Sequence, residues 1–416
     1  MTFGGLLDWA RHARWLTRGR IIAGGQVLLL IELTILVLLA LWQHGVINDH
    51  VSNTSSDFVS FYAAGKLALA GTPALAYDQA AHFLVEQRFT EAGAPYQFFF
   101  YPPVFMLLFA PLALLPYYVA FYVFETATLA LFLFTMQRIL REPGWLWAFP
   151  VLAFPAIFWT FGLGQNAFLT ASLFGGFTLL IERRPTLAGM LLGLLCYKPH
   201  FGLLAPVGLV SGSHWRAFLA AGATVAGLVA MSVALFGVET WQAYLTAFAG
   251  SGSVYASGRI DYAGIVTPFG AARLLGFDPR VSYLVQALVT GSMVLLTALV
   301  WRWVKNGNLR SATLLAATLL AVPLALLYDK LLLLVAIGWL VREARHDGFR
   351  PWEKTTLAAT YLASLAEYAI GSAWSLPLGP FVSLAVLVLA VRRTALLRDD
   401  PAIHVVILPG DVSRAG

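Results

Sequence analysis

One carboxylate, Asp57, stands in the polar stretch 44–101, directly before a helical run that begins at Phe58. A carboxylate held in a partly desolvated cleft acts as a general base toward an acceptor hydroxyl. The residue before a helix is also the N-cap position, where an aspartate accepts a backbone N–H. Position alone leaves both interpretations of Asp57 open, and one carboxylate can satisfy both.

Two side-chain amides, Gln165 and Asn166, follow Gly164 between apolar blocks. Amides at the start of a membrane helix cap that helix or join it to a neighbour. They are also suited to sugar hydroxyls, because each amide offers a donor and an acceptor. Both interpretations stay open here as well.

Lys198 lies between the apolar runs 185–197 and 201–210, two residues before His200. A lysine in this setting is costly unless its ammonium group reaches the interface or meets an anion. We therefore expect Lys198, with His200 beside it, either to extend to the membrane surface or to bind a phosphate group as a point charge.

Two further motifs flank apolar spans. Tyr101-Pro102-Pro103 is typical of an aromatic belt with proline in the first helical turn, or of a rigid entrance beside a site. The step Tyr328-Asp329-Lys330 interrupts an apolar stretch that extends from 312 to 341. It is either a self-neutralising pair or a second contact to a phosphate or a sugar, with Lys330 a candidate for the phosphate.

The sequence lacks the motifs of several common enzyme classes. There is no HExxH, no CxxC pair, no P-loop and no GxGxxG, so metalloprotease, ATPase and dinucleotide chemistry lack support. The one cysteine, Cys196, cannot form a disulfide within the chain.

The composition indicates a polytopic all-α membrane protein. Hydrophobic residues make up 59% of the 416 residues and charged residues only 12%, against about 25% in soluble domains. Basic residues are scattered at span ends, which reports orientation and gives no sign of nucleic-acid binding. The first apolar stretch, 23–42, is too long for a cleavable signal peptide and is expected to be a retained span. We expect a single domain of about 11–13 transmembrane helices.

The positive-inside tendency predicts the orientation. Arginines near both ends place the N-terminus, 1–22, and the tail, 394–416, in the cytoplasm. The polar stretch 44–101 then forms a large first outer loop with interfacial helices, and 237–280 forms a second outer loop. The candidate residues all fall on the outer face of a cell inner membrane: Asp57, Tyr101, Gln165, Asn166, Lys198, His200, Asp329 and Lys330. Such convergence is what a site opening to that side requires.

The region 102–161 poses a parity problem, because it must start and end outside yet shows three apolar blocks: 103–115, 117–138 and 145–161. The third is short and holds two prolines, so we expect it to be re-entrant or broken. This assignment places Arg138 and Arg141 outside, against the positive-inside tendency.

Five motifs in order resemble glycosyltransferase family 87, also known as DUF2029. They are the acid of the first outer loop; F-Y-A-A-G-K-x-x-x-x-G-T-P-x-x-x-Y at 61–77; Y-P-P-V with A-P-L-A-L-L-P, from 101 to 116; G-Q-N at 164–166; and A-G-M-L-L-G-L-x-x-Y-K-P at 188–199. The resemblance covers about 55–215. Beyond it, only hydropathy and the Tyr328-Asp329 step agree.

The resemblance implies a GT-C fold and an inverting transferase that moves one hexose, with mannose favoured, from a polyprenyl-phosphate donor. The acceptor is a lipid or a glycan on the non-cytoplasmic face. Asp57 matches the family's proposed catalytic base. The family's transferases generally need no bound metal, so the resemblance implies neither a metal nor a cofactor. We expect Lys198, His200 and Lys330 to bind the donor phosphate, and Gln165, Asn166, Tyr101, Tyr62 and Asp329 to contact the sugar or the acceptor.

Two alternatives stay open, one from another class of protein and one a different kind of transferase. A secondary transporter or lipid flippase would also carry charges along a substrate path, but it should show related sequence halves, and none are visible. An O-antigen-ligase-like transferase would take an oligosaccharide from a diphosphate-linked donor.

Overall fold

The computed structural model is helical, and it describes residues 3–43, 57–91, 93–256 and 260–398. Ser55 and Ser56, which precede Asp57, lie outside the described residues, as does 399–416 of the expected tail. Within the described residues there are no β-strands, only one isolated bridge, between Ile265 and Leu326. The chain is an all-α polytopic membrane protein, as the composition predicts.

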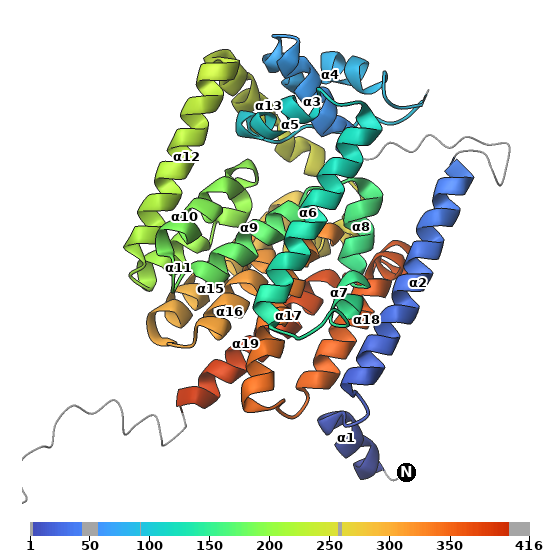
Figure 1. Cartoon of the computed structure of the whole chain (residues 1–416), viewed down its shortest axis with the longest axis vertical. Coiled ribbons are helices and arrows are strands. Elements are labelled where there is room, and N and C mark those ends of the chain that lie inside the picture. Colours follow the sequence, from blue (N-terminus) through green and yellow to red (C-terminus); the bar gives the residue numbers. More distant parts are fainter. Residues whose placement is uncertain (1–2, 44–56, 92, 257–259, 399–416) are drawn as a thin grey trace, which may run out of the picture.

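Four described helices are long and apolar enough to cross a membrane: α2 (Arg18–Gln43), α6 (Tyr117–Leu140), α12 (Trp215–Phe236) and α15 (Pro279–Trp303). On α2 and α12 the large apolar side chains point outward, and Leu30 and Leu219 are each 67% exposed. A soluble protein rarely exposes such faces, so these two helices present them to lipid. They stand on opposite sides of the molecule (Figure 1).

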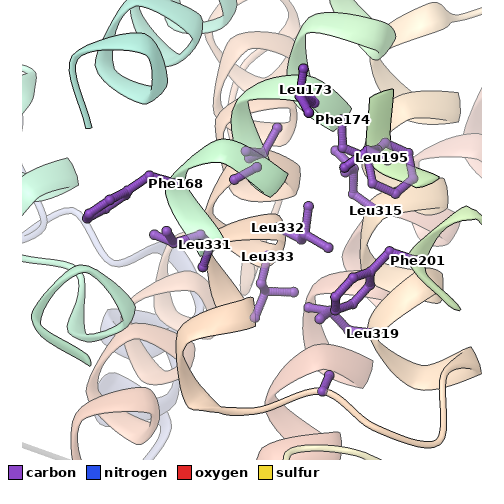
Figure 2. Close-up of a cluster of buried hydrophobic side chains, with 14 of the residues drawn as sticks. Phe168, Leu173, Phe174, Leu195, Phe201, Leu315, Leu319, Leu331, Leu332 and Leu333 are labelled. Carbon is purple, nitrogen blue, oxygen red and sulfur yellow. The ribbon is translucent and has the colours of Figure 1, made fainter. Parts of the chain in front are cut away.

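The core is built from shorter helices that are largely apolar. These are α9 (Ala167–Leu180), α16 (Gly307–Ala321) and α17 (Leu331–Asp347), and α16 is buried over nearly its whole length. A helix that is apolar all round belongs in the interior. Figure 2 shows Phe168 and Phe174 of α9 with Leu315 and Leu319 of α16 and Leu331 to Leu333 of α17. Helix α9 of this core begins directly after Asn166.

A layer of short elements covers the end of the molecule opposite α1 (Phe3–His12). It contains α3 (Phe58–Leu69), η1 (Pro73–Tyr77), α4 (Gln79–Glu86), η2 (Pro103–Phe105) and α5 (Met106–Leu112) from the first predicted outer loop and the block after it. The helix α13 (Val238–Ala256) of the second predicted loop joins them (Figure 1), and the ring of Tyr77 contacts that of Tyr244 there.

The structure corrects the placement of Arg138 and Arg141. Helix α5 has seven residues, about 10 Å of length, and it packs on α3 rather than crossing. The crossing is made by α6, whose far end is fixed by Glu142, which pairs with Arg18 at 3.1 Å and with Arg345 at 2.6 Å. The end of α6 therefore lies on the N-terminal face, and the prediction that Arg138 and Arg141 lie on the other face was wrong.

The return from that face is a broken helix, as predicted, but it is not re-entrant. It consists of α7 (Ala148–Leu152) and α8 (Pro155–Leu163), interrupted where Pro155 opens the second piece. The far end of α8 meets the layer, because the Leu163 carbonyl accepts a hydrogen bond from the Asp57 backbone N–H at 2.8 Å. One crossing by α6 and one by α7 and α8 resolve the parity problem.

A second broken segment begins and ends on the N-terminal face. It comprises α10 (Pro185–Gly193), η3 (Leu194–Tyr197), η4 (Pro199–Gly202) and α11 (Ala205–Ser211). Its two ends are tied together by Arg310, which contacts both Glu182 and His214. The segment thus enters the molecule and returns, and its turn holds Lys198. Non-helical backbone of this kind is tolerated at membrane depth where protein surrounds it.

The remaining elements close the bundle. They are η5 (Tyr262–Gly264), α14 (Pro268–Leu274), η6 (Leu327–Lys330), α18 (Glu353–Trp374) and α19 (Gly379–Arg398).

Candidate active site

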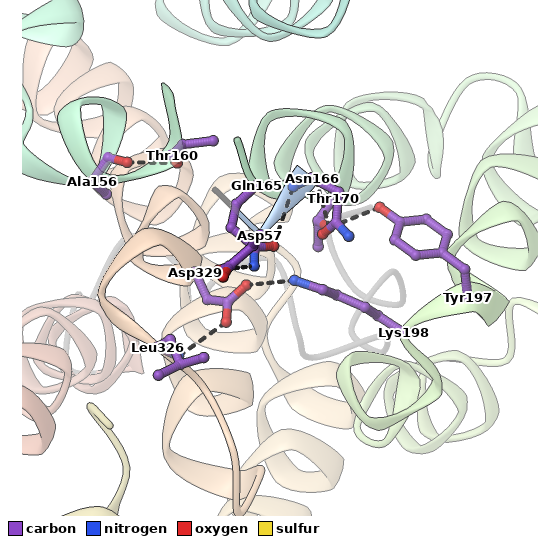
Figure 3. Close-up of polar contacts among 10 residues, drawn as sticks. All are labelled: Asp57, Ala156, Thr160, Gln165, Asn166, Thr170, Tyr197, Lys198, Leu326 and Asp329. Atoms are coloured by element: carbon purple, nitrogen blue, oxygen red, sulfur yellow. Dashed lines mark hydrogen bonds and ion pairs between the residues drawn. The ribbon is translucent and has the colours of Figure 1, made fainter. Parts of the chain in front are cut away.

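The carboxylate of Asp57 is half-buried at the start of α3 and makes no capping hydrogen bond to that helix. Instead its Oδ2 accepts a hydrogen bond from Nε2 of Gln165 at 2.6 Å. The N-cap interpretation describes the position of Asp57 but not the use of its side chain, because the carboxylate points to the α8–α9 turn (Figure 3).

The α8–α9 turn is shaped by Gly164, whose φ of 65° lies in the left-handed region that favours glycine. The backbone N–H of Gln165 then closes the end of α8 by donating to the Thr160 carbonyl at 2.9 Å. This geometry turns the Gln165 side chain toward Asp57 and leaves Asn166 at the start of α9. The sequence predicted only that this turn and the outer-loop acid lie on the same face, and the structure adds the direct contact between Gln165 and Asp57.

Asn166 is fully buried, at 0% exposure, and within the described part of the chain neither Oδ1 nor Nδ2 makes a hydrogen bond of normal geometry. The hydroxyl of Tyr101 is a polar neighbour outside that geometry. Buried amides are almost always paired, and an unpaired one costs about 1–3 kcal/mol. An unsatisfied donor and acceptor beside a carboxylate are what a hydroxyl-bearing ligand would satisfy.

Lys198 forms a buried ion pair with Asp329, with Nζ 2.9 Å from Oδ1. The other oxygen, Oδ2, accepts the Leu326 backbone N–H at 3.0 Å, so the carboxylate is fixed to η6. The ammonium also lies over the ring of Tyr328, 5.3 Å from its centroid. An ammonium has three N–H donors. The ion pair with Asp329 uses one of them, so Lys198 keeps donors for a ligand.

The electrostatics of Asp57 combine three effects. Burial raises the pKa of this carboxyl group, while the Gln165 hydrogen bond and the positive charge of Lys198 lower it, and the net shift is upward. The raised pKa makes Asp57 a stronger base than an exposed aspartate once it is ionised. The positive charge of Lys198 thus acts on Asp57, in the other half of the site.

An aromatic wall lines this site. Tyr101 stacks on Phe105 at 4.5 Å between ring centroids and faces Tyr197 at 6.4 Å. The Tyr197 hydroxyl is 2.7 Å from Oγ1 of Thr170, one turn into α9. Thr170 was not singled out from the sequence, since nothing local in the sequence reports a contact 27 residues away.

Two predicted residues, Lys330 and Tyr62, make other contacts. Lys330 is paired with Glu367 and also donates to Ser364 at 3.1 Å, both on α18. Tyr62 donates its hydroxyl to the Leu115 carbonyl at 2.8 Å within the aromatic packing of the outer layer. Lys330 thus binds α18 and Tyr62 packs in the outer layer, and we do not carry them into the proposed site.

His200 is half-buried, and its ring lies against Phe201 at 4.4 Å between centroids. It remains a candidate by its place after Lys198. Among the described residues, no three His, Cys, Asp or Glu side chains are arranged to hold a metal ion.

The fold and the site together define a helical membrane protein in which an acid, two amides and a paired lysine converge beneath a layer of short helices. Comparison with protein families agrees. The model of glycosyltransferase family 87 matches residues 99–328, more than half of the chain, and the chain belongs to this family.

The match includes Tyr101, Gln165, Asn166, Lys198 and His200, whereas Asp57, Asp329 and Lys330 lie outside it. Neither the curated proteins nor the solved structures gave a match to the chain. The assignment of Asp57 therefore rests on its contact with Gln165, which lies inside the matched region.

Proposed function

We propose that this glycosyltransferase has a GT-C fold and moves a single hexose, with mannose favoured, from a polyprenyl-phosphate donor to a lipid or glycan hydroxyl. The reaction takes place on the non-cytoplasmic face of the inner membrane and inverts the anomeric configuration. The observation that carries the proposal is the contact between Asp57 and Gln165 in an electrostatic environment shared with Lys198.

In the first part of the reaction, the Asp57 carboxylate takes the proton of the acceptor hydroxyl. The acceptor oxygen forms a bond to the anomeric carbon as the bond from that carbon to the phosphate oxygen breaks. General-base assistance of this kind contributes about 10²–10⁴-fold in rate. Gln165 fixes the orientation of the carboxylate through the 2.6 Å hydrogen bond.

The leaving polyprenyl phosphate gains negative charge as the bond breaks. Lys198 stabilises that charge with the N–H donors that Asp329 does not use, in a buried setting where such an interaction is stronger than in water. Asp329 fixes the direction of the Lys198 side chain. His200, beside it, completes the expected phosphate-binding end.

The unpaired amide of Asn166 binds a hydroxyl group of the sugar, donating through Nδ2 and accepting through Oδ1. Tyr101 forms the adjoining wall. A neutral amide and aromatic rings suit a neutral sugar rather than a charged one.

A donor panel tests the proposal. Purified protein in liposomes receives radiolabelled polyprenyl-phosphate mannose, glucose or arabinose with a membrane lipid extract as the source of acceptor. We expect label in a new product with one monophosphate donor. Label only from a diphosphate-linked oligosaccharide would contradict the proposal in favour of a ligase, and label that crosses the bilayer without transfer would indicate a flippase.

A further inference from the structure

A second buried polar cluster lies between α3 and α4, behind the helix that begins after Asp57. It contains Ser60, His82 and Glu86, each no more than 1% exposed. Within the described residues, Ser60 Oγ, His82 Nδ1 and Glu86 Oε1 have no hydrogen-bond partner of normal geometry. Three such atoms close together are unusual, because buried polar atoms are nearly always paired.

The position of the protons follows from the contacts. Nε2 of His82 lies 3.0 Å from the Ser60 carbonyl oxygen, which only accepts, so Nε2 carries a hydrogen and donates it. In the neutral ring Nδ1 then carries a lone pair and no hydrogen, and this atom lies 3.4 Å from Oε1 of Glu86. Two lone pairs would repel, whereas one proton between them makes a hydrogen bond.

The pair is connected to Asp57 through the backbone of α3. The Ser60 carbonyl that His82 holds belongs to the first turn of α3, and the Ser60 N–H donates to the Asp57 carbonyl at 3.2 Å. Glu86 is itself fixed, since its Oε2 accepts the Gln97 backbone N–H at 3.1 Å. The cluster thus ties the start of α3 to α4 and to the segment before Tyr101.

We propose that His82 and Glu86 share one proton, and that His82, held by Glu86 through it, is a positioning residue that fixes the first turn of α3 and so the direction of Asp57. The proposal rests on the role given to Asp57 above. Neither His82 nor Glu86 touches the reacting atoms.

The pKa values of His82 and Glu86 set the pH range over which the pair holds one proton. Burial raises the pKa of Glu86 to about 8, with a further rise from the negative charge of Asp57. Burial lowers the pKa of His82 to about 4. The ring of Tyr96 faces the pair at 5.7 Å from that of His82, and its phenol lies near the charges of Glu86 and Asp78. The positive charge of Lys198 acts on Asp57. Between these two values the pair holds one proton, and above about pH 8 it loses that proton to solvent.

The test is the ratio of kcat at about pH 9 to kcat at about pH 7. Wild-type kcat falls about tenfold, because only a small fraction of pairs keeps its proton one unit above a pKa of about 8. In Glu86→Gln the side-chain amide donates an N–H to Nδ1 at every pH, so the ratio stays near one. His82→Phe lowers kcat at both pH values with little change in the donor KM. Glu91→Gln, an exposed site on the same segment, keeps the wild-type ratio.

An alkaline fall in Glu86→Gln equal to that of wild type would overturn the proposal, as would a wild-type kcat in His82→Phe. A second measurement needs no activity. The infrared difference between wild type and Glu86→Gln at about pH 7 contains a protonated carboxyl band if the pair holds its proton, and lacks it otherwise. The band does not depend on any sugar donor. The experiment therefore distinguishes an error in the proposed function from an error in the proposal of a shared proton.

Discussion

Among single residues, the site contains polar groups of two kinds. The charges of Lys198 and Asp329 are satisfied by each other, whereas the amide of Asn166 is buried without a normal hydrogen bond in the described part of the chain. Removing a satisfied charge leaves its partner uncompensated, whereas removing the Asn166 amide breaks no hydrogen bond of normal geometry among the described residues. Substitutions at the two kinds of position should therefore separate stability from activity.

Asn166→Ala should lower kcat/KM about 10–100-fold while leaving the unfolding temperature unchanged or slightly raised, because the apo protein loses an unpaired group rather than a bond. Thr170→Val is the control on the same helix. It loses the 2.7 Å hydrogen bond to Tyr197 and should cost about 1 kcal/mol of stability. Thermal unfolding and transfer kinetics on both variants check this, and a large drop in stability for Asn166→Ala would contradict it.

Lys198→Met and Lys330→Met form a matched pair, since each removes a buried lysine from an ion pair. Both should destabilise the protein by about 3–5 kcal/mol, as a buried carboxylate is left alone. Only Lys198→Met should also raise the donor KM, by about 10–100-fold, because a charge-assisted hydrogen bond to phosphate is lost. Equal donor KM values in the two variants, measured in folded protein, would refute the assignment of Lys198.

The sequence was sufficient to select Asp57, Gln165, Asn166 and Lys198, because a polar residue between apolar blocks is conspicuous. It could not separate Asp329 from Lys330. Successive residues on a 3₁₀ turn point about 120° apart, so Asp329 reaches Lys198 while Lys330 reaches α18. Hydropathy carries no information about that direction.

The length of each helix determines whether it can cross the membrane. Helix α5 is too short to cross and packs on α3, and this packing requires Gly65, where a Cβ would overlap the backbone carbonyl of Phe109. The apolar composition of 103–115 predicts a crossing, which the structure does not show. Apolar composition reports burial, and burial against a neighbouring helix gives the same signal as burial in lipid.

Gly65→Ala should therefore push α3 away from α5, destabilise the protein by about 1–3 kcal/mol and lower kcat through the displaced Asp57. Gly24→Ala on α2 is the control, since nothing lies within 4 Å of its Cβ, and it should be neutral or slightly stabilising. Thermal unfolding in detergent measures both. A Gly65→Ala variant as stable and active as wild type would show that the α3–α5 contact is loose.

For the whole molecule, the described helices give one arrangement in which Arg138 and the N-terminal helix share a face and α3, α4 and α5 cover the other. The membrane class and the polar character of the 44–101 stretch were predictable from composition. The sidedness of 102–161 was not, because it depends on which of three apolar blocks crosses.

Cysteine labelling tests that arrangement. In a Cys196→Ala background, a membrane-impermeant thiol reagent on intact cells should modify Glu91→Cys, whose site is exposed on the α3 side. It should modify Arg138→Cys only after the membrane is opened. Labelling of Arg138→Cys in intact cells would contradict the proposed orientation.

The most direct measurement of the central claim compares sugar transfer by wild type, Asp57→Asn and Asp78→Asn. Asparagine at 57 keeps an acceptor for Gln165 but cannot take a proton, so the account predicts a loss of about 10²–10⁴-fold in kcat with little change in stability. Asp78 caps α4 by accepting the Ala81 N–H at 2.8 Å, and asparagine caps equally well, so this control should transfer at the wild-type rate. Transfer by folded Asp57→Asn at the wild-type rate would contradict the account.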